Sequence, residues 1–383
     1  MQTTTQFPLV HRPRRMRRNE NLRRMARETR LSIDNLVQPL FLVDGEGVRQ
    51  EIASMPGQYR LSIDELVREA EALDALGIPA VDLFPKIDDA VKTPGGEASL
   101  DPQGLYLRAI RAVKQAVPRL LVITDVALDP YSSDGHDGIV RGGEIVNDET
   151  LDILSRMAVA HAEAGADVVA PSDMMDGRVA AIRAALDDAG YTGTSILSYT
   201  AKYASAFYGP FRDALDSAPR ELKNVPKDKK TYQMDPANTD EAVREARLDI
   251  EEGADMIMVK PGMPYLDIVR LVRERSALPA STGPRTCLKP SRSRAVVAKT
   301  KLRSASAVRD TRSRNTRASA TWRRGSRQAR PKRDPSSSTK TDTPIGREGM
   351  KPRSRRRSIA ASADTTPSGP SYAPIRRRCE ARR

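Results

Sequence analysis

Two lysine residues each follow directly on a run of apolar residues. Lys202 follows SILSYTA, and Lys260 follows ADMIMV and precedes Pro261-Gly262. If these runs are neighbouring parallel strands, the two amines converge at the same end of a sheet. Each ammonium then disfavours charge on the other and burial adds a desolvation penalty, so we expect at least one amine to be neutral near pH 7. A neutral amine is a nucleophile that forms a Schiff base with a carbonyl substrate.

A second group of reactive residues lies in one segment, Asp125 to Gly138 (DVALDPYSSDGHDG), which holds four aspartates and a histidine. Such a loop can bind a hard cation or supply an acid and a base, although Asp-Gly pairs also form ordinary turns. It is not an EF-hand, because the sixth position from Asp129 is Asp134 rather than glycine. His11 and His161 have no comparable neighbours, and we assign them structural roles.

The segment 203–235 is long and has no clear periodicity. A connection of this length is usually a functional lid or a disordered excursion. It contains residues suited to binding a carboxylate near the two lysines, namely Arg212, Lys229, Lys230 and Gln233.

Positioning these residues requires strands and helices that alternate along the chain. Apolar runs predict six strands, at 36–43, 80–84, 120–126, 167–172, 195–201 and 254–259. Amphipathic segments predict helices at 62–76, about 103–116, 149–164, 178–189, 239–252 and 266–276. Ser62 and Glu65 have the spacing of a capping box for the first of these helices. Short apolar strands between such helices indicate parallel βα units that are buried on both faces.

An internal repeat sets the size of the unit. EAGADVVAPS (163–172) aligns with EEGADMIMVK (251–260), and three glycines that end predicted helices, Gly77, Gly165 and Gly253, are spaced 88 residues apart. One βα unit then averages about 44 residues and eight need about 350, which favours a (β/α)8 TIM barrel. The strand pattern stops after six strands, where residues 277–280 lead into a different composition, and strands one and six are expected to expose apolar edges.

Charge is divided unevenly along the chain, whose formal net charge is +14. Residues 281–383 hold 29 Lys+Arg against 6 Asp+Glu, whereas residues 1–280 carry a net charge of −9. Both cysteines lie in the basic tail, which excludes disulfides and thiolate-bound metals from residues 1–280. The sequence has no apolar run long enough to span a bilayer and no secretory h-region behind the first arginines, so we expect a cytoplasmic protein without membrane contact.

These patterns predict three parts: an N-terminal arm at 1–30, a partial barrel at 31–280 and a basic tail at 281–383. The tail has only nine Val, Ile, Leu, Met or Phe residues, too few for a core, so it is expected to be disordered. Its abrupt excess of Arg, Ser, Pro and Thr is also what a frame-shifted translation of a GC-rich gene produces. We favour this origin over a genuine appended tail. Translation of the gene downstream of codon 279 in the other frames tests it.

Several long motifs resemble one enzyme family. SYTAKYASAFYGPFRDA (198–214), KKTYQMDPAN (229–238), EEGADMIMVKPGMPYLD (251–267), APSDMMDGR (170–178) and DVALDPYSSDGHDG (125–138) are similar to motifs of delta-aminolevulinic acid dehydratase, or porphobilinogen synthase. The resemblance runs from about residue 12 to about residue 280. It implies a TIM-barrel lyase that condenses two molecules of 5-aminolevulinate into porphobilinogen, with loss of water, early in tetrapyrrole and haem synthesis.

The resemblance also implies roles for individual residues. Lys202 and Lys260 match the lysines that form Schiff bases with the two substrate molecules. Further positions match residues that bind substrate or line the active site: Arg212, Lys229, Gln233, Asp125 and Ser172. The family's seventh strand carries a serine in a V-S-G-E-Y-like motif and its eighth a tyrosine, both of which hold the carboxylate of the substrate on the Lys260 side. Neither motif occurs in residues 281–383.

Metal use and assembly follow from the same resemblance. Zinc-dependent members present three cysteines after the third strand, and the matching positions here are Ala127, Asp129 and Asp137. Hard oxygen ligands in place of thiolates imply magnesium, with or without a monovalent cation, and no zinc. An allosteric magnesium ion is expected at Glu245, although a solvated surface glutamate is the alternative. The family forms homo-octamers in which the N-terminal arm, here Arg12 to Arg18, contacts a neighbour.

Two other functions are compatible with parts of the sequence. A Schiff-base aldolase for another ketone would need only one lysine, so two trapped substrate molecules per site would favour the condensation. The basic tail, with Trp322 and Tyr372, is expected to bind polyanions in a salt-sensitive way. It has no recognition module and few aromatic residues, so we expect no specific nucleic-acid partner.

Overall fold

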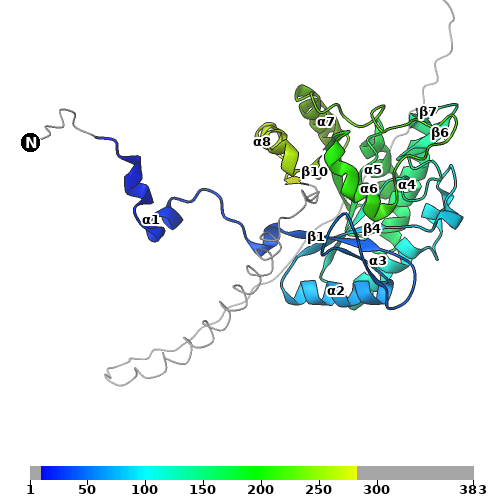
Figure 1. The fold of residues 1–383 in the computed structure, drawn as a ribbon, viewed down its shortest axis with the longest axis horizontal. Coiled ribbons are helices and arrows are strands. Elements are labelled where there is room, and N and C mark those ends of the chain that lie inside the picture. The colour runs from blue at the N-terminus through cyan, green and yellow to red at the C-terminus, as the bar shows by residue number, and fades with distance from the viewer. Residues whose placement is uncertain (1–9, 283–383) are drawn as a thin grey trace, which may run out of the picture. The chain divides into compact units, whose positions relative to one another are not determined.

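The computed structural model describes residues 10–282, which form a curled, mostly parallel sheet flanked by helices (Figure 1). The sheet order is β11-β10-β9-β8-β5-β4-β1-β3-β2, and only the β2–β3 pair is antiparallel. The strands are β1 (Val37–Leu42), β2 (Arg49–Glu51), β3 (Tyr59–Leu61), β4 (Ala80–Pro85), β5 (Leu121–Val126), β8 (Val168–Pro171), β9 (Ser195–Lys202), β10 (Met256–Lys260) and β11 (Ala280–Thr282). Residues 1–9 and 283–383, which include nearly all of the predicted basic tail, lie outside the described residues.

Helices alternate with the parallel strands, as the sequence predicts. The main ones are α2 (Ile63–Ala75), α3 (Leu105–Ala116), α4 (Asn147–Glu163), α5 (Arg178–Asp188), α7 (Asp240–Glu251) and α8 (Leu266–Arg275). Shorter elements are α1 (Glu20–Met25), α6 (Gly209–Leu215) and a hairpin of β6 (Ile139–Arg141) and β7 (Glu144–Val146). Single 3-10 turns are η1 (Pro13–Arg17), η2 (Ile33–Asn35), η3 (Asp89–Val91), η4 (Glu97–Leu100), η5 (Ala206–Tyr208) and η6 (Met263–Tyr265). This alternation gives the α/β architecture of a TIM barrel. No helix in the described part of the chain is long and apolar enough to cross a membrane.

The three regularly spaced glycines lie where their repeat predicts, just after helices α2, α4 and α7. Gly77, Gly165 and Gly253 have φ values of 81°, 106° and 105°. This left-handed region is strained for residues that have a Cβ, so glycine is the residue that ends these helices and lets the chain enter the next strand.

The structure corrects the prediction that the barrel stops after six strands. A short seventh strand, β11, pairs in parallel with β10 over three residues, from Ile257↔Ala280 to Val259↔Thr282. The predicted open edge of β1 is also partly covered, because β3 pairs with Phe41 and Leu42. Among residues 10–282 the sheet therefore curls without closing, and the first part of β1 and the outer edge of β11 remain unpaired.

The predicted capping box at Ser62 is wrong, although the helix begins there. The Ser62 side chain makes no cap hydrogen bond to α2. Its hydroxyl accepts the Val48 amide at 2.8 Å and contacts the Asp64 carboxylate at 2.5 Å. The hydroxyl therefore joins the helix start to the segment before β2.

Candidate active site

Lys202 and Lys260 end adjacent strands and lie side by side in the sheet. β9 and β10 are parallel, and their register pairs Lys260 directly with Lys202. Both side chains are buried, with 2% and 1% of their surface exposed. The predicted convergence of two amines at the carboxyl ends of neighbouring strands is therefore present in the structure.

Lys260 lies in a cage of aromatic rings. Its Nζ is 3.8 Å from the ring centre of Phe211, 4.5 Å from Tyr199, 5.1 Å from Tyr208 and 5.2 Å from Phe84. The amine has no hydrogen-bond partner among the described residues. Burial lowers the pKa of Lys260 to about 7. The negative charge of Asp125 opposes this decrease, and the positive charge of Lys202 offsets part of that opposition.

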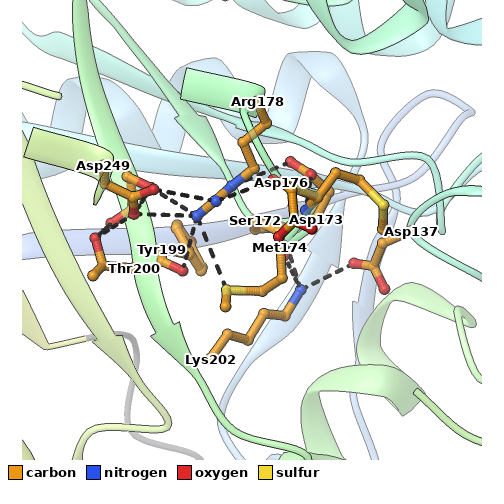
Figure 2. Close-up of polar contacts among 12 residues, drawn as sticks. Asp137, Ser172, Asp173, Met174, Asp176, Arg178, Tyr199, Thr200, Lys202 and Asp249 are labelled. Atoms are coloured by element: carbon orange, nitrogen blue, oxygen red, sulfur yellow. Dashed lines mark hydrogen bonds and ion pairs between the residues drawn. The ribbon is translucent and has the colours of Figure 1, made fainter. Parts of the chain in front are cut away.

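Lys202 has the opposite environment. Its ammonium donates to Asp137 at 3.0 Å and to the carbonyl oxygen of Ser172, as Figure 2 shows. Burial alone would lower the pKa of Lys202, but Asp137, Asp129 and Asp125 outweigh it and raise the pKa above the usual value. The two lysines therefore differ in charge near neutral pH.

A buried network of ionic and hydrogen-bond contacts is centred on Arg178. In Figure 2 the Arg178 guanidinium reaches Asp249 of α7, with nitrogen to oxygen distances of 3.2 and 3.3 Å. It also donates to the Ser198 hydroxyl of β9 at 2.9 Å. Because Arg178 and Asp249 are both 2% exposed, their pairing offsets the cost of burying two charges. The network ties α5, α7 and β9 together behind Lys202.

The predicted acidic loop, residues 125–138, contacts Lys202 and Lys229. Lys229 donates to Asp129 at 3.0 Å and to Asp137 at 2.8 Å, so Asp137 lies between two ammonium groups. Burial opposes ionisation of Asp137, yet Lys202 and Lys229 hold its pKa far below the usual value. Lys229, which we expected to bind substrate, already has two carboxylate partners here. His136 is also engaged, with its ring nitrogens 3.1 Å from the Tyr232 hydroxyl and 2.8 Å from the Pro226 carbonyl oxygen.

Asp125, near the end of β5, lies close enough to Lys202 and Lys260 for their positive charges to affect its pKa. Burial raises the pKa of Asp125 to about 6, although Lys260 and Lys202 oppose the shift. Its Oδ1 atom has no hydrogen-bond partner among the described residues, whereas its backbone amide donates to the Tyr106 hydroxyl at 2.9 Å. A buried carboxyl with a pKa near neutrality can both donate and accept a proton.

The segment 203–235 covers this end of the sheet and is more ordered than its sequence suggests. It contains η5 and α6, and α6 contributes Phe211 to the aromatic cage. Two of its predicted substrate-binding residues have buried polar atoms without hydrogen-bond partners among residues 10–282: Arg212 Nε and both side-chain polar atoms of Gln233. Buried polar atoms are normally paired, so these are free to bind a polar ligand.

The segment 203–235, which we call the lid, also contacts the acidic loop. The Arg220 amide donates to the Asp134 carbonyl at 3.0 Å. A Cβ added at Gly135, where φ is +73°, would lie 2.1 Å from the Ala218 carbonyl oxygen. Only glycine therefore allows the lid backbone to approach the loop so closely.

The structure separates Glu245 from the other two predicted metal ligands, Asp129 and Asp137. Asp129 and Asp137 are paired with lysines, which compete with a cation for the same oxygens. Within residues 10–282, no group of three His, Cys, Asp or Glu side chains is arranged to hold a metal ion. Glu245 lies on α7 in a separate cavity of about 560 Å³, which is also lined by Glu144, Asp176 and Glu241. Burial raises the pKa of Glu245 to about 7, partly opposed by Arg178.

The aromatic cage is the part of the site that the sequence reasoning missed. The ring centre of Tyr208 lies 5.6 Å from Lys202 Nζ and 5.3 Å from the Arg212 guanidinium carbon, and the same ring faces Lys260. The available signal was the sequence AFYGPF within a predicted polar lid, because buried aromatic residues are unexpected in a solvated loop.

Comparison with known proteins agrees with this arrangement. The sequence model described as delta-aminolevulinic acid dehydratase matches residues 10–282. The chain is 56% identical over 271 residues to the Bradyrhizobium diazoefficiens protein of that name, covering 71% of this chain and 76% of the relative. It is 53% identical to the Halalkalibacterium halodurans protein, covering 70% and 80%.

A solved structure is similar over the same part of the chain. It is the Toxoplasma gondii delta-aminolevulinic acid dehydratase, or porphobilinogen synthase, in complex with its reaction product porphobilinogen. The TM-score is 0.70 at 52% sequence identity, and the match covers 73% of this chain and 78% of that one. Together with the paired lysines at the ends of β9 and β10, these similarities show that the chain belongs to the delta-aminolevulinic acid dehydratase family.

Proposed function

We propose that this chain is a porphobilinogen synthase that condenses two molecules of 5-aminolevulinate through imines on Lys202 and Lys260. The observation that carries the proposal is the register pairing of two buried lysines, one of which has an amine without a hydrogen-bond partner in the described structure. A single-substrate aldolase has no need of the second amine. The reaction makes the chain a lyase of tetrapyrrole and haem synthesis.

The chemistry begins at Lys260. With a pKa of about 7, half of its amines are neutral at pH 7 and able to attack the ketone carbon of 5-aminolevulinate. The resulting carbinolamine loses water to give the imine, a step that needs an acid. Asp125, with a pKa of about 6, is the buried group that we assign to this proton transfer and to later proton removal.

We assign the second imine to Lys202, whose amine is positioned by hydrogen bonds to Asp137 and the Ser172 carbonyl oxygen. It must lose its proton before it attacks, and Asp137 is too acidic to take that proton efficiently. Substrate entry that displaces Lys202 from Asp137 would remove the charge that raises its pKa. We assign the unpartnered atoms of Arg212 and Gln233 to the substrate carboxylate on this side.

Reductive trapping tests the two imines. Incubating the full chain with 5-aminolevulinate and sodium borohydride should add two substrate-derived masses, and peptide mass spectrometry should locate them on Lys202 and Lys260. Lys260→Met should remove one adduct, and Lys202→Met the other. Lys86→Met, at a lysine outside the cage, is the control. Trapping and turnover that survive Lys260→Met would show that the roles are wrong, and a single adduct in the unmodified chain would favour an aldolase.

We also propose a magnesium site at Glu245. The cavity beside Glu245 is also lined by Glu144, Asp176 and Glu241, but these side chains do not form a three-residue ligand cluster among the described residues, so Glu245 would bind Mg²⁺ together with water molecules, as this ion commonly does. When bound there, the ion would supply positive charge that keeps these carboxylates ionised. Asp129 and Asp137 fit a cation poorly, because Lys229 already pairs with both and Lys202 also pairs with Asp137. Asp129 and Asp137 are therefore not part of the proposed magnesium site.

Magnesium binding can be measured without activity. Millimolar Mg²⁺ should raise the melting temperature of the full chain, since a ligand bound only to the folded state stabilises it. Glu245→Gln should abolish this shift, whereas Glu251→Gln, on the same helix but exposed, should retain it. An unchanged Mg²⁺ response in Glu245→Gln would rule out the site.

We further propose that the chain is cytoplasmic and forms a homo-octamer through its N-terminal arm. Large apolar side chains of this segment are exposed in the single chain, including Val10, Met16 and Met25. Exposed apolar residues in one segment are typical of a subunit contact. Light scattering of the full chain, compared with a variant that lacks residues 1–30, measures the assembly directly.

A further inference from the structure

An acidic side chain, Asp82, lies inside the curled sheet without an evident structural reason. It occupies the middle of β4, is 4% exposed and lines a small cavity with Ile123, Leu197 and Met258, which belong to the apolar interior cluster. Its Oδ1 atom has no hydrogen-bond partner among the described residues. Burial, together with the nearby charge of Asp125, raises the pKa of Asp82 well above its usual value, partly opposed by Lys260 and the Tyr199 hydrogen bond.

Among the described residues, the one hydrogen bond of the Asp82 side chain connects it to a neighbour of Lys260. The Tyr199 hydroxyl donates to Asp82 Oδ2 at 3.4 Å. Tyr199 is fully buried, and its ring centre lies 4.5 Å from Lys260 Nζ. Tyr199 therefore contacts Asp82 at its hydroxyl and Lys260 at its ring.

The position of the Lys260 amine depends on these rings. Since Nζ has no hydrogen-bond partner in the described structure, its near contacts are the four aromatic faces. A ring face attracts an ammonium, so an oriented ring both places the amine and favours its charged form. Without an acceptor, the buried Tyr199 hydroxyl would have to turn toward another partner and move the ring.

We propose that Asp82 is a positioning residue for Lys260: by accepting the Tyr199 hydroxyl, it holds the ring against which the amine rests. The inference rests on the proposed role of Lys260 as an imine-forming amine. The competing explanation is a direct effect of charge on Asp82. Other ionisable groups that act on Lys260 are Asp125 of β5, Lys202 of β9 and Asp129 of the acidic loop.

Competitive labelling with acetic anhydride tests the proposal without substrate. The full chain is labelled between pH 5 and 11, and peptide mass spectrometry gives the titration midpoint of each lysine. The variants are Asp82→Asn, which is neutral and keeps an oxygen acceptor, Asp82→Leu, which has none, and Tyr199→Phe, which lacks the hydroxyl. Lys202 in the same samples is the internal control for a folded site.

If Asp82 acts through Tyr199, Asp82→Leu and Tyr199→Phe should both lower the Lys260 midpoint by about half a pH unit, because the ring that favours the ammonium is no longer held. Asp82→Asn should match the unmodified chain, and the Lys202 midpoint should not move. The proposal is overturned if Tyr199→Phe leaves the Lys260 midpoint unchanged, or if Asp82→Asn shifts it as far as Asp82→Leu. Because no substrate is present, the result is independent of whether 5-aminolevulinate is the substrate.

Discussion

At the scale of single residues, the site depends on placing two lysines in different surroundings. The sequence indicated which lysines these are, because each ends an apolar run, and it indicated that one amine would be neutral. It could not show which one. That depends on Asp137, which reaches Lys202, and on four rings around Lys260, contacts that bring together residues from distant parts of the chain.

The difference between the lysines predicts how imine formation varies with pH. Since burial lowers the pKa of Lys260 to about 7, its neutral fraction should rise about fivefold between pH 6 and 7 and less than twofold between pH 7 and 8. Lys202, whose pKa is raised, should remain mostly protonated over this range. Cyanoborohydride trapping with 5-aminolevulinate, quantified for each lysine, measures both profiles. A parallel rise at the two lysines would contradict the assignment.

At the scale of elements, periodicity predicted the alternating strands and helices to within a few residues. The internal repeat also placed Gly77, Gly165 and Gly253 after their helices. What sequence patterns missed were short pieces set by tertiary contacts: the β6–β7 hairpin, α6 in the lid and the strand β11. Three-residue strands and a helix of two turns carry too little periodicity to be recognised alone.

The contact between the lid and the acidic loop gives a prediction at this scale. Gly135→Ala would place a Cβ 2.1 Å from the Ala218 carbonyl oxygen, so the lid must move away. We expect the KM for 5-aminolevulinate to rise about tenfold or more, because Arg212 and Gln233 lie on the same segment. Gly142→Ala is the matched control: its φ is +63°, but no atom lies within 4 Å of the added Cβ. Equal KM values for the two variants would attribute the effect to backbone strain instead.

At the scale of the whole molecule, the described sheet is an open form of a barrel. β11 pairs with β10 over three residues, and the first residues of β1 have only β4 beside them. The −9 charge of residues 1–280 and the basic composition of residues 281–383 are separate properties, since the structure describes most of the first segment and only two residues of the second.

The open edge predicts complementation. A separate fragment of the Bradyrhizobium diazoefficiens relative that follows the matched region should add to β11 and β1 by strand pairing. If the fragment supplies the serine and tyrosine that the family resemblance implies for the last strands, we expect porphobilinogen formation to increase severalfold when it is added. A colorimetric pyrrole assay and co-elution of the fragment measure the effect. The same fragment with proline at alternate strand positions is the control, and equal stimulation by both would exclude strand addition.

The short β11 strand has a consequence for specificity. The described residues supply both amines, the four rings around Lys260 and the polar groups on the Lys202 side, whereas the part of the site beyond β11 belongs to whatever polypeptide pairs with β11 next. An engineered strand beside β11 with a different side chain facing the site would then present the same reactive amine to a different ketone.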